Sequence, residues 1–157
     1  MNRVFALAAF IIGAATAALH AQNFDIKRES DKANKQTLPA AAKSIEDNTD
    51  VKIVLTVDAN SFGKDVHAWS NLNIIANRIV GAVSEVGRDQ VGKDALERDV
   101  KKVVVVKIGA DAEDLVELKD QTVFVRTNAS DKAMTVLQNV IIAALEKALH
   151  TGHPPIP

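Results

Sequence analysis

The chain has no cysteine and no tyrosine, and only one tryptophan and four prolines, in 157 residues. The absence of cysteine excludes disulfide bonds, thiol catalysis, cysteine-ligated metal sites and lipid attachment at a lipoprotein cysteine. Glycine is also scarce, and neither G-x-x-x-x-G-K-[ST] nor G-x-G-x-x-G, the motifs of phosphate-binding loops, occurs in full. The sequence therefore disfavours nucleotide-dependent enzymes, and packing alone must stabilise the fold.

A strong charge of either sign is absent as well. The formal net charge is −1, and basic residues between positions 98 and 107 are mixed with acidic ones. Aromatic residues make up only 4% of the chain, so few side chains are available to stack on bases. Nucleic acid is therefore not an expected partner.

The first 21 residues have the pattern of an export signal. Residues 1–21 contain Arg3, an uncharged apolar run from Val4 to Leu19, and small residues that end at Ala21. This pattern predicts a secretory signal peptide that is removed after Ala21, because the apolar run is shorter than the roughly 20 residues that span a bilayer. No later apolar run reaches that length, so we expect a periplasmic or secreted protein without a membrane span after removal of the leader.

The remaining chain is long enough for one domain with a substantial core. Residues 22–36 are mostly polar, and we interpret them as a mobile amino-terminal arm with a short edge strand at Phe24–Lys27. Residues 37–149 are interpreted as a single domain, and residues 150–157 as a flexible tail, because Pro154 and Pro155 cannot continue a helix.

Hydrophobic periodicity predicts the elements of this domain. A two-residue alternation at 52–58 is typical of a half-buried strand, and a 3.6-residue period at 68–86 indicates an amphipathic helix. By similar reasoning we expect short helices at 37–47 and from Asp94, strands at 102–108 and 121–127, and a last helix at 131–149. The segment between the last two strands is assigned one helical turn, which makes their pairing antiparallel.

A long helix between the first two strands implies that these strands are parallel. The prediction is an α/β (α+β) two-layer sandwich, with a small mixed sheet of three to four strands and helices packed mainly on one face.

The loop after the first strand is one candidate site. It gathers polar side chains at the carboxyl end of a parallel strand, where open α/β sheets bind ligands: Asp58, Ser61, Asp65, His67 and Trp69. Asp65 and His67 are also candidate ligands for a divalent metal. Ser61 with His67 as base would make a hydrolase, but the nucleophile motif G-x-S-x-G is absent. The alternative is that Asn60, Ser61 and Asp65 cap the helix and turn the chain into it.

Two surfaces are candidate interfaces. The polar stripe of the long helix carries Asn73, Ile74, Asn77 and Gly81, where an apolar side chain and a glycine suit a docked helix. The outer side of the sheet, with Val54, Thr56, Phe124 and alternate valines at 103–106, needs cover from the amino-terminal segment or from another subunit.

Catalytic sets are scarce, so we expect a protein that is not an enzyme and that holds no cofactor. The interpretation is an exported α/β domain that binds another envelope or secreted protein or self-associates. The alternative is a protein that binds a small ligand or a divalent metal through the Asp58–Trp69 loop.

Overall fold

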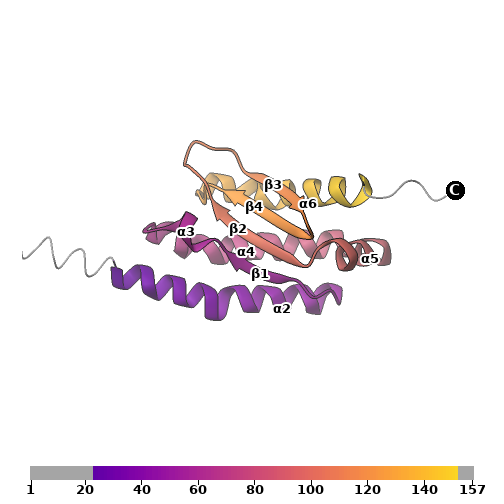
Figure 1. The fold of residues 1–157 in the computed structure, drawn as a ribbon, viewed down its shortest axis with the longest axis horizontal. Coiled ribbons are helices and arrows are strands. Elements are labelled where there is room, and N and C mark those ends of the chain that lie inside the picture. Colours follow the sequence, from indigo (N-terminus) through magenta and orange to yellow (C-terminus); the bar gives the residue numbers. More distant parts are fainter. Residues whose placement is uncertain (1–22, 152–157) are drawn as a thin grey trace, which may run out of the picture.

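Four strands form one mixed sheet in the order β1-β2-β4-β3, and helices pack against one of its faces (Figure 1). The computed structural model describes residues 23–151, and the side chains of residues 131–135, 150 and 151 lie outside that description. The predicted signal peptide and the tail beyond residue 151 also fall outside it. The predicted two-layer α/β sandwich is confirmed.

The elements follow the predicted periodicity over most of the chain. The strands are β1 (Val54–Val57), β2 (Lys102–Lys107), β3 (Leu115–Lys119) and β4 (Thr122–Thr127). The helices are α2 (Leu38–Thr49), α3 (Ala59–Phe62), α4 (Val66–Val86), α5 (Gln90–Asp99) and α6 (Asp131–Thr151). The predicted short helix from Asp94 begins four residues earlier, because the side chain of Asp89 accepts the N–H of Gly92 and caps α5 there.

The short edge strand predicted in the amino-terminal arm was wrong. Residues 23–32 are helical, and a π turn, η1 (Ala33–Thr37), joins them to α2, so no strand forms at Phe24–Lys27. Ala33 is buried, and Ile26 packs against the core. The π turn precedes Pro39, which has no N–H to donate to the preceding turn of an α-helix.

The segment between β2 and β4 was also predicted wrongly. It contains β3 in place of a helical turn, and β3 pairs antiparallel with β4. Because this hairpin returns the chain to the edge of β2, the pairing of β2 with β4 is parallel and not antiparallel. The pairing of β1 with β2 is parallel, as predicted.

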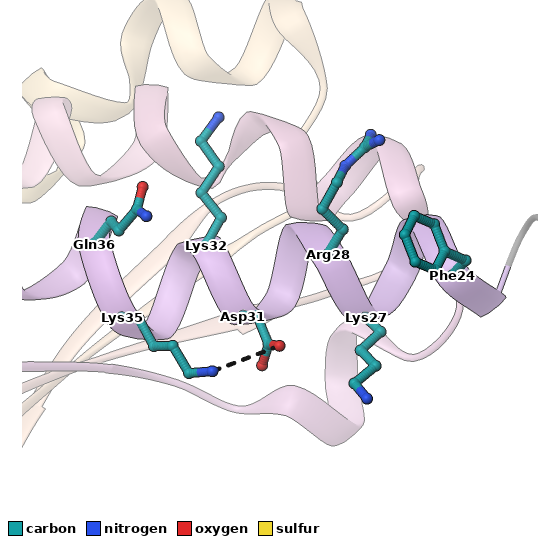
Figure 2. A pocket seen from close by; sticks show the side chains of 7 residues that line it. All are labelled: Phe24, Lys27, Arg28, Asp31, Lys32, Lys35 and Gln36. Carbon is teal, nitrogen blue, oxygen red and sulfur yellow. Dashed lines mark ion pairs between the residues drawn. The ribbon is translucent and has the colours of Figure 1, made fainter.

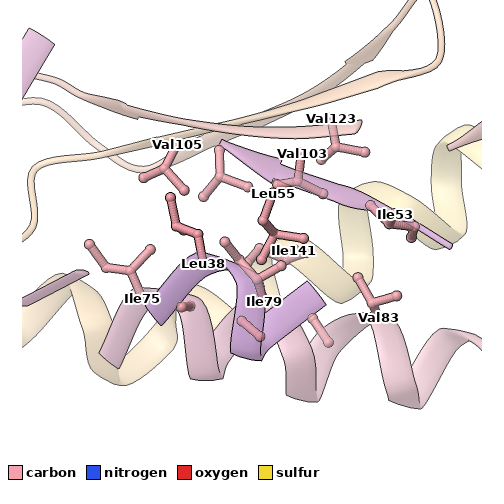
Figure 3. Packing of buried hydrophobic residues seen from close by; sticks show 14 of the residues in the cluster. Leu38, Ile53, Leu55, Ile75, Ile79, Val83, Val103, Val105, Val123 and Ile141 are labelled. Carbon is pink, nitrogen blue, oxygen red and sulfur yellow. The ribbon is translucent and has the colours of Figure 1, made fainter. Parts of the chain in front are cut away.

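The core lies between the inner face of the sheet and the helices. Figure 3 shows Val103, Val105 and Val123 of the sheet directed toward Ile75 and Ile79 of α4. Further buried side chains come from α2, α4 and α6: Leu38, Ile45, Leu72, Val83, Leu137, Ile141 and Leu145. The helix α4 contacts both α2 and α6, so it is the middle helix of its layer.

Glycine is required at one helix corner. A Cβ atom at position 92 would lie 1.8 Å from the carbonyl oxygen of Val86, far inside van der Waals contact. Gly92 therefore lets α5 begin directly against the end of α4, which places Leu96 in the core.

Candidate functional site

The two aspartates of the predicted ligand loop cap helices. The carboxylate of Asp58 accepts the N–H of Asn60 at 3.1 Å at the start of α3. The carboxylate of Asp65 accepts the N–H of Ala68 at 3.0 Å at the start of α4. Both side chains thus satisfy backbone donors that a helix terminus leaves without an intrahelical partner.

Ser61 joins this loop to the sheet. Its hydroxyl donates to the carbonyl of Asp58 at 2.7 Å and accepts the N–H of Lys107 at 2.9 Å. The hydroxyl hydrogen is therefore directed at a backbone oxygen, whereas a nucleophilic serine donates it to a base. Ser61 consequently holds the end of β2 and does not have the geometry of a hydrolase nucleophile.

The charge of Asp65 is stabilised locally. The N–H of Ala68 holds the pKa of Asp65 below its ordinary value of 3.8, and the ammonium of Lys107, 3.2 Å from the carboxylate, acts in the same direction. A carboxylate with a lowered pKa is a poor proton acceptor at neutral pH. This environment suits a structural cap and ion pair.

The other two residues, His67 and Trp69, lie at the start of α4. Trp69 is buried with its ring 4.9 Å from that of Phe62, and its indole N–H donates to the carbonyl of Gly63 at 3.3 Å. The Nε2 atom of His67 lies 3.1 Å from the amide nitrogen of Asn71. The same amide nitrogen of Asn71 donates to the carbonyl of Ala129, and so ties α4 to the turn before α6.

The loop therefore does not assemble a recognisable metal or acid–base set. Among the side chains that the structure describes, no three from His, Asp or Glu lie close enough together to hold a metal ion. Each side chain that we singled out in the loop, from Asp58 to Trp69, has a partner within the fold.

The helix corner at Gly87 carries part of a phosphate-loop spacing. Gly92 and Lys93 follow Gly87 as in that motif, but Asp94 stands where a serine or threonine would bind magnesium. The corner joins two helices and not a strand to a helix, and the N–H of Gly92 is already bonded to Asp89. This corner does not form a phosphate cradle.

The predicted stripe on the long helix is partly covered by the chain itself. Asn73 and Asn77 are exposed, and Ile74 is 39% exposed. At Gly81, in contrast, the amide of Gln138 from α6 lies within 3 Å of the place a Cβ atom would take. Gly81 thus serves the contact between α4 and α6, whereas docking through Asn73, Ile74 and Asn77 stays a prediction.

Two hollows open on the surface. One of about 530 Å³ is lined only by residues of the amino-terminal helix (residues 23–37), among them Phe24, Arg28 and Lys32 (Figure 2). The other, of about 540 Å³, lies between the loop before β3 and the side chains of Val136 and Val140 on α6. The first has walls from a single helix, and neither gathers a set of side chains with an evident chemistry.

The outer side of the sheet faces away from the helix layer (Figure 1). We define the outer sheet face by the outward side chains of the four strands: Val54, Thr56, Lys102, Val104, Val106, Leu115, Glu117, Lys119, Thr122, Phe124 and Arg126. Val54 is 58% and Leu115 48% exposed, and Val104, Val106 and Phe124 are only half-buried. Within the helix layer η1 contacts α2 and α4, so the cover that we considered from the amino-terminal segment does not form in the described chain.

Charges border the apolar part of the outer sheet face. Arg126 pairs with Glu117 at 3.1 Å, and its guanidinium lies 5.9 Å from the centre of the Phe124 ring. Lys102 and Lys119, at the opposite end of the strands, form no ion pair with any side chain that the structure describes. The face therefore combines an apolar centre with polar and charged margins, as protein interfaces do.

In residues 23–151 no helix is long and apolar enough to cross a membrane. Comparison of the chain with protein-family models, with curated proteins and with solved structures found no match.

Proposed function

We propose that this protein is an exported, non-enzymatic α/β domain that binds another envelope or secreted protein, or a second copy of itself, through the outer sheet face. The observation that carries the proposal is the uncovered apolar side of the sheet, with Val104, Val106 and Phe124 at its centre. Covering the apolar centre of this face is favourable by about 25 cal/mol for each Å² of apolar surface that is removed from water.

The organisation of the rest of the molecule favours this role over catalysis. The polar side chains of the Asp58–Trp69 loop serve as helix caps and as links between elements. Binding of a small ligand or a divalent metal at this loop, the alternative prediction, requires Asp65 to give up its bond to Ala68 or its ion pair with Lys107. The outer sheet face needs no such rearrangement to accept a partner.

Export is part of the proposal and rests on residues 1–21. The intact mass of the protein recovered from the envelope or secreted fraction tests it directly. A mass that corresponds to residues 22–157 supports cleavage after Ala21. Recovery of the full-length chain from the cytoplasm alone would contradict export without affecting the interface.

Photocrosslinking in living cells tests the interface. A photoreactive amino acid is placed at position 104 or 124 on the outer sheet face, and at Ser44, an exposed position of α2, as the matched control. We expect discrete crosslinked products from positions 104 and 124 and none from position 44. A third position, Asn77, tests the stripe on α4.

The products are separated by mass and identified by peptide sequencing. Equal crosslinking at positions 44, 104 and 124, or no crosslinking at any of them, would contradict the proposed function. Products from position 77 alone would move the interface to the helix layer.

A further inference from the structure

The amino-terminal helix has one side that packs on the domain and one that faces solvent. Ile26 and Ala33 lie on the packed side. The opposite side is exposed and carries most of the residues around the hollow of about 530 Å³: Phe24, Lys27, Arg28, Asp31, Lys32 and Lys35. Figure 2 shows them along the two sides of the helix axis, with Phe24 at the start. We name this surface the basic face, because it holds four cations and one carboxylate.

Part of this positive charge is neutralised within the helix. The ammonium of Lys35 pairs with Asp31 at 3.6 Å, as the dashed line in Figure 2 marks. The guanidinium of Arg28 lies 3.4 Å from Asp25 and 3.1 Å from Glu29. Both of these acidic residues are half-buried, so they flank the basic face and are not part of it.

The other two cations of the basic face have no such partner. Lys27 and Lys32 are exposed and form no ion pair with any side chain in the described part of the chain. Phe24, which is 67% exposed, adds an apolar ring at the start of the same helix. A surface with unpaired lysines beside an aromatic ring complements an anionic lipid surface, which attracts the ammonium groups and accepts the ring at its boundary.

The preceding chain favours a membrane over other anionic partners. The apolar run Val4–Leu19 ends five residues before Phe24. Export, as proposed above, places this run in the membrane until the leader is removed. Five residues span at most about 18 Å, and the headgroup layer on each side of a bilayer is about 5–7 Å thick. The amino-terminal helix therefore starts its existence outside the cytoplasm beside lipid headgroups, which no other anionic partner is bound to do.

We infer that the basic face binds an anionic lipid surface of the envelope, with Phe24 at the headgroup boundary and Lys27 and Lys32 against lipid phosphates. The inference rests on the exported state in the proposed function and not on its interface. The amino-terminal helix belongs to the helix layer, on the other side of the sheet from the outer sheet face (Figure 1). A domain that is held at the membrane by the basic face thus keeps the outer sheet face open for a partner.

The side chains on the page set the strength of this binding. A lysine close to an anionic bilayer strengthens binding about fivefold, which corresponds to about 1 kcal/mol. Two unpaired lysines and one aromatic ring bind less tightly than a single myristoyl chain, whose binding constant is about 10⁴ M⁻¹. We therefore expect reversible binding with half-saturation at millimolar lipid. Salt should weaken it, because the Debye length falls from about 10 Å at 0.1 M to about 3 Å at 1 M.

Co-sedimentation of the purified mature protein with vesicles tests the inference. We expect binding to vesicles of equal parts phosphatidylglycerol and phosphatidylcholine, none to pure phosphatidylcholine, and loss of binding in about 1 M salt. Lys27→Gln combined with Lys32→Gln should weaken binding at least tenfold, because about fivefold is lost for each charge. Lys27→Arg combined with Lys32→Arg keeps both charges and should bind as wild type does.

Two exposed lysines outside the amino-terminal helix provide the matched control. Lys52→Gln combined with Lys147→Gln removes the same charge from the approach to β1 and from α6, and should change binding less than twofold. An equal loss in this control, or no binding of wild-type protein to the anionic vesicles, would overturn the inference. Circular dichroism with thermal unfolding checks that all variants are folded, as expected for exposed lysines.

Fluorescence of a Phe24→Trp variant separates a bilayer from a soluble anion. Trp69 is buried in the core, so a change in emission on binding reports the indole at position 24. Anionic vesicles should shift this emission to shorter wavelengths, because the ring leaves water, whereas polyaspartate in solution should not. Equal affinity for polyaspartate and vesicles, without a shift, would overturn the lipid surface in favour of an acidic protein.

The vesicle and crosslinking experiments fail independently. A protein that stays off anionic vesicles but gives crosslinked products at positions 104 and 124 overturns this inference and retains the proposed function. A protein that binds the vesicles through Lys27 and Lys32 but gives no such products supports the inference and overturns the proposed interface.

Discussion

The carboxylate of Asp65 lies 3.0 Å from the N–H of Ala68 and 3.2 Å from the ammonium of Lys107. These two contacts lower the pKa of Asp65 below 3.8. A carboxyl whose pKa is lower in the folded than in the unfolded chain stabilises the fold above its unfolded pKa. That stability is lost as the pH falls through the folded pKa.

We therefore expect Asp65→Ala to lower the free energy of unfolding by about 1–2 kcal/mol at neutral pH, because the cap of α4 is lost. The difference from wild type should shrink well below pH 3.8, where the wild-type carboxylate becomes protonated. Urea denaturation at the two pH values measures both differences. Asp65→Asn keeps an oxygen that can cap α4, and should cost no more than about 0.5 kcal/mol.

A difference for Asp65→Ala that stays constant into acid would show that the ionised carboxylate contributes nothing to stability. A large loss of stability in Asp65→Asn would instead assign the effect to the ion pair with Lys107.

The residues between β1 and α4 show which contacts can be predicted from the sequence and which cannot. The sequence correctly placed Asp58, Ser61 and Asp65 between the first strand and the long helix, but it did not predict α3, the short helix that contains Ser61. It could not show that the hydroxyl of Ser61 accepts the N–H of Lys107, because these residues are 46 positions apart. A polar residue in a loop looks the same in sequence whether it caps a helix or binds a ligand, and only its partners distinguish the two.

At the scale of elements, β3 was missed although its pattern was visible. Leu115, Glu117 and Lys119 alternate with the half-buried Val116 and Leu118, which is the period of a strand. The turn to β4 concealed it, because Asp120 and Gln121 both have positive φ without the glycine or asparagine that marks such hairpins.

The helix over residues 23–37 was missed for another reason. Its apolar positions are few, and local ion pairs such as Asp31 with Lys35, one turn apart, accompany the helix there. Ala33 is buried by a contact of η1 with α4, which is distant in the sequence. The hydrophobic periodicity of residues 23–37 therefore gave little indication of a helix.

Buried and outward side chains alternate along β2, and this alternation leads to a prediction. Val105 is fully buried against the helices, whereas its neighbour Val104 lies on the outer sheet face. Val105→Asp should unfold the chain, because it places an unpaired charge in the core. Val104→Asp should leave a folded protein within about 1 kcal/mol of wild type, since solvent reaches that side chain.

Circular dichroism with thermal unfolding of the two variants checks this prediction. Two equally stable variants, or two unfolded ones, would contradict the one-sided burial of the sheet. The same folded Val104→Asp protein is also a useful probe of the proposed interface, since any loss of association is then independent of unfolding.

At the scale of the molecule, the sequence predicted the two layers correctly and the strand connection incorrectly. The parallel pairing of β1 with β2 followed from one long helix between two strands. The position of β4 between β2 and β3 depends on a hairpin that had not been recognised. Whether the outer sheet face is covered could not be predicted, because that depends on where residues 23–37 pack.

The contribution of the amino-terminal helix to the whole fold leads to the last prediction. Phe24 is 67% exposed and Ile26 only partly buried, whereas Ala33 and Ile45 lie within the core. A chain that begins at Ala33 should therefore unfold cooperatively and lose only about 1–2 kcal/mol, the value of burying part of one large apolar side chain. Ile45→Ala in the intact protein should cost about 2–5 kcal/mol, because it leaves a cavity beneath the sheet. Thermal unfolding of both variants shows which of them loses more stability. If the truncation costs more than Ile45→Ala, residues 23–32 are an integral part of the domain and its boundary lies before Asn23.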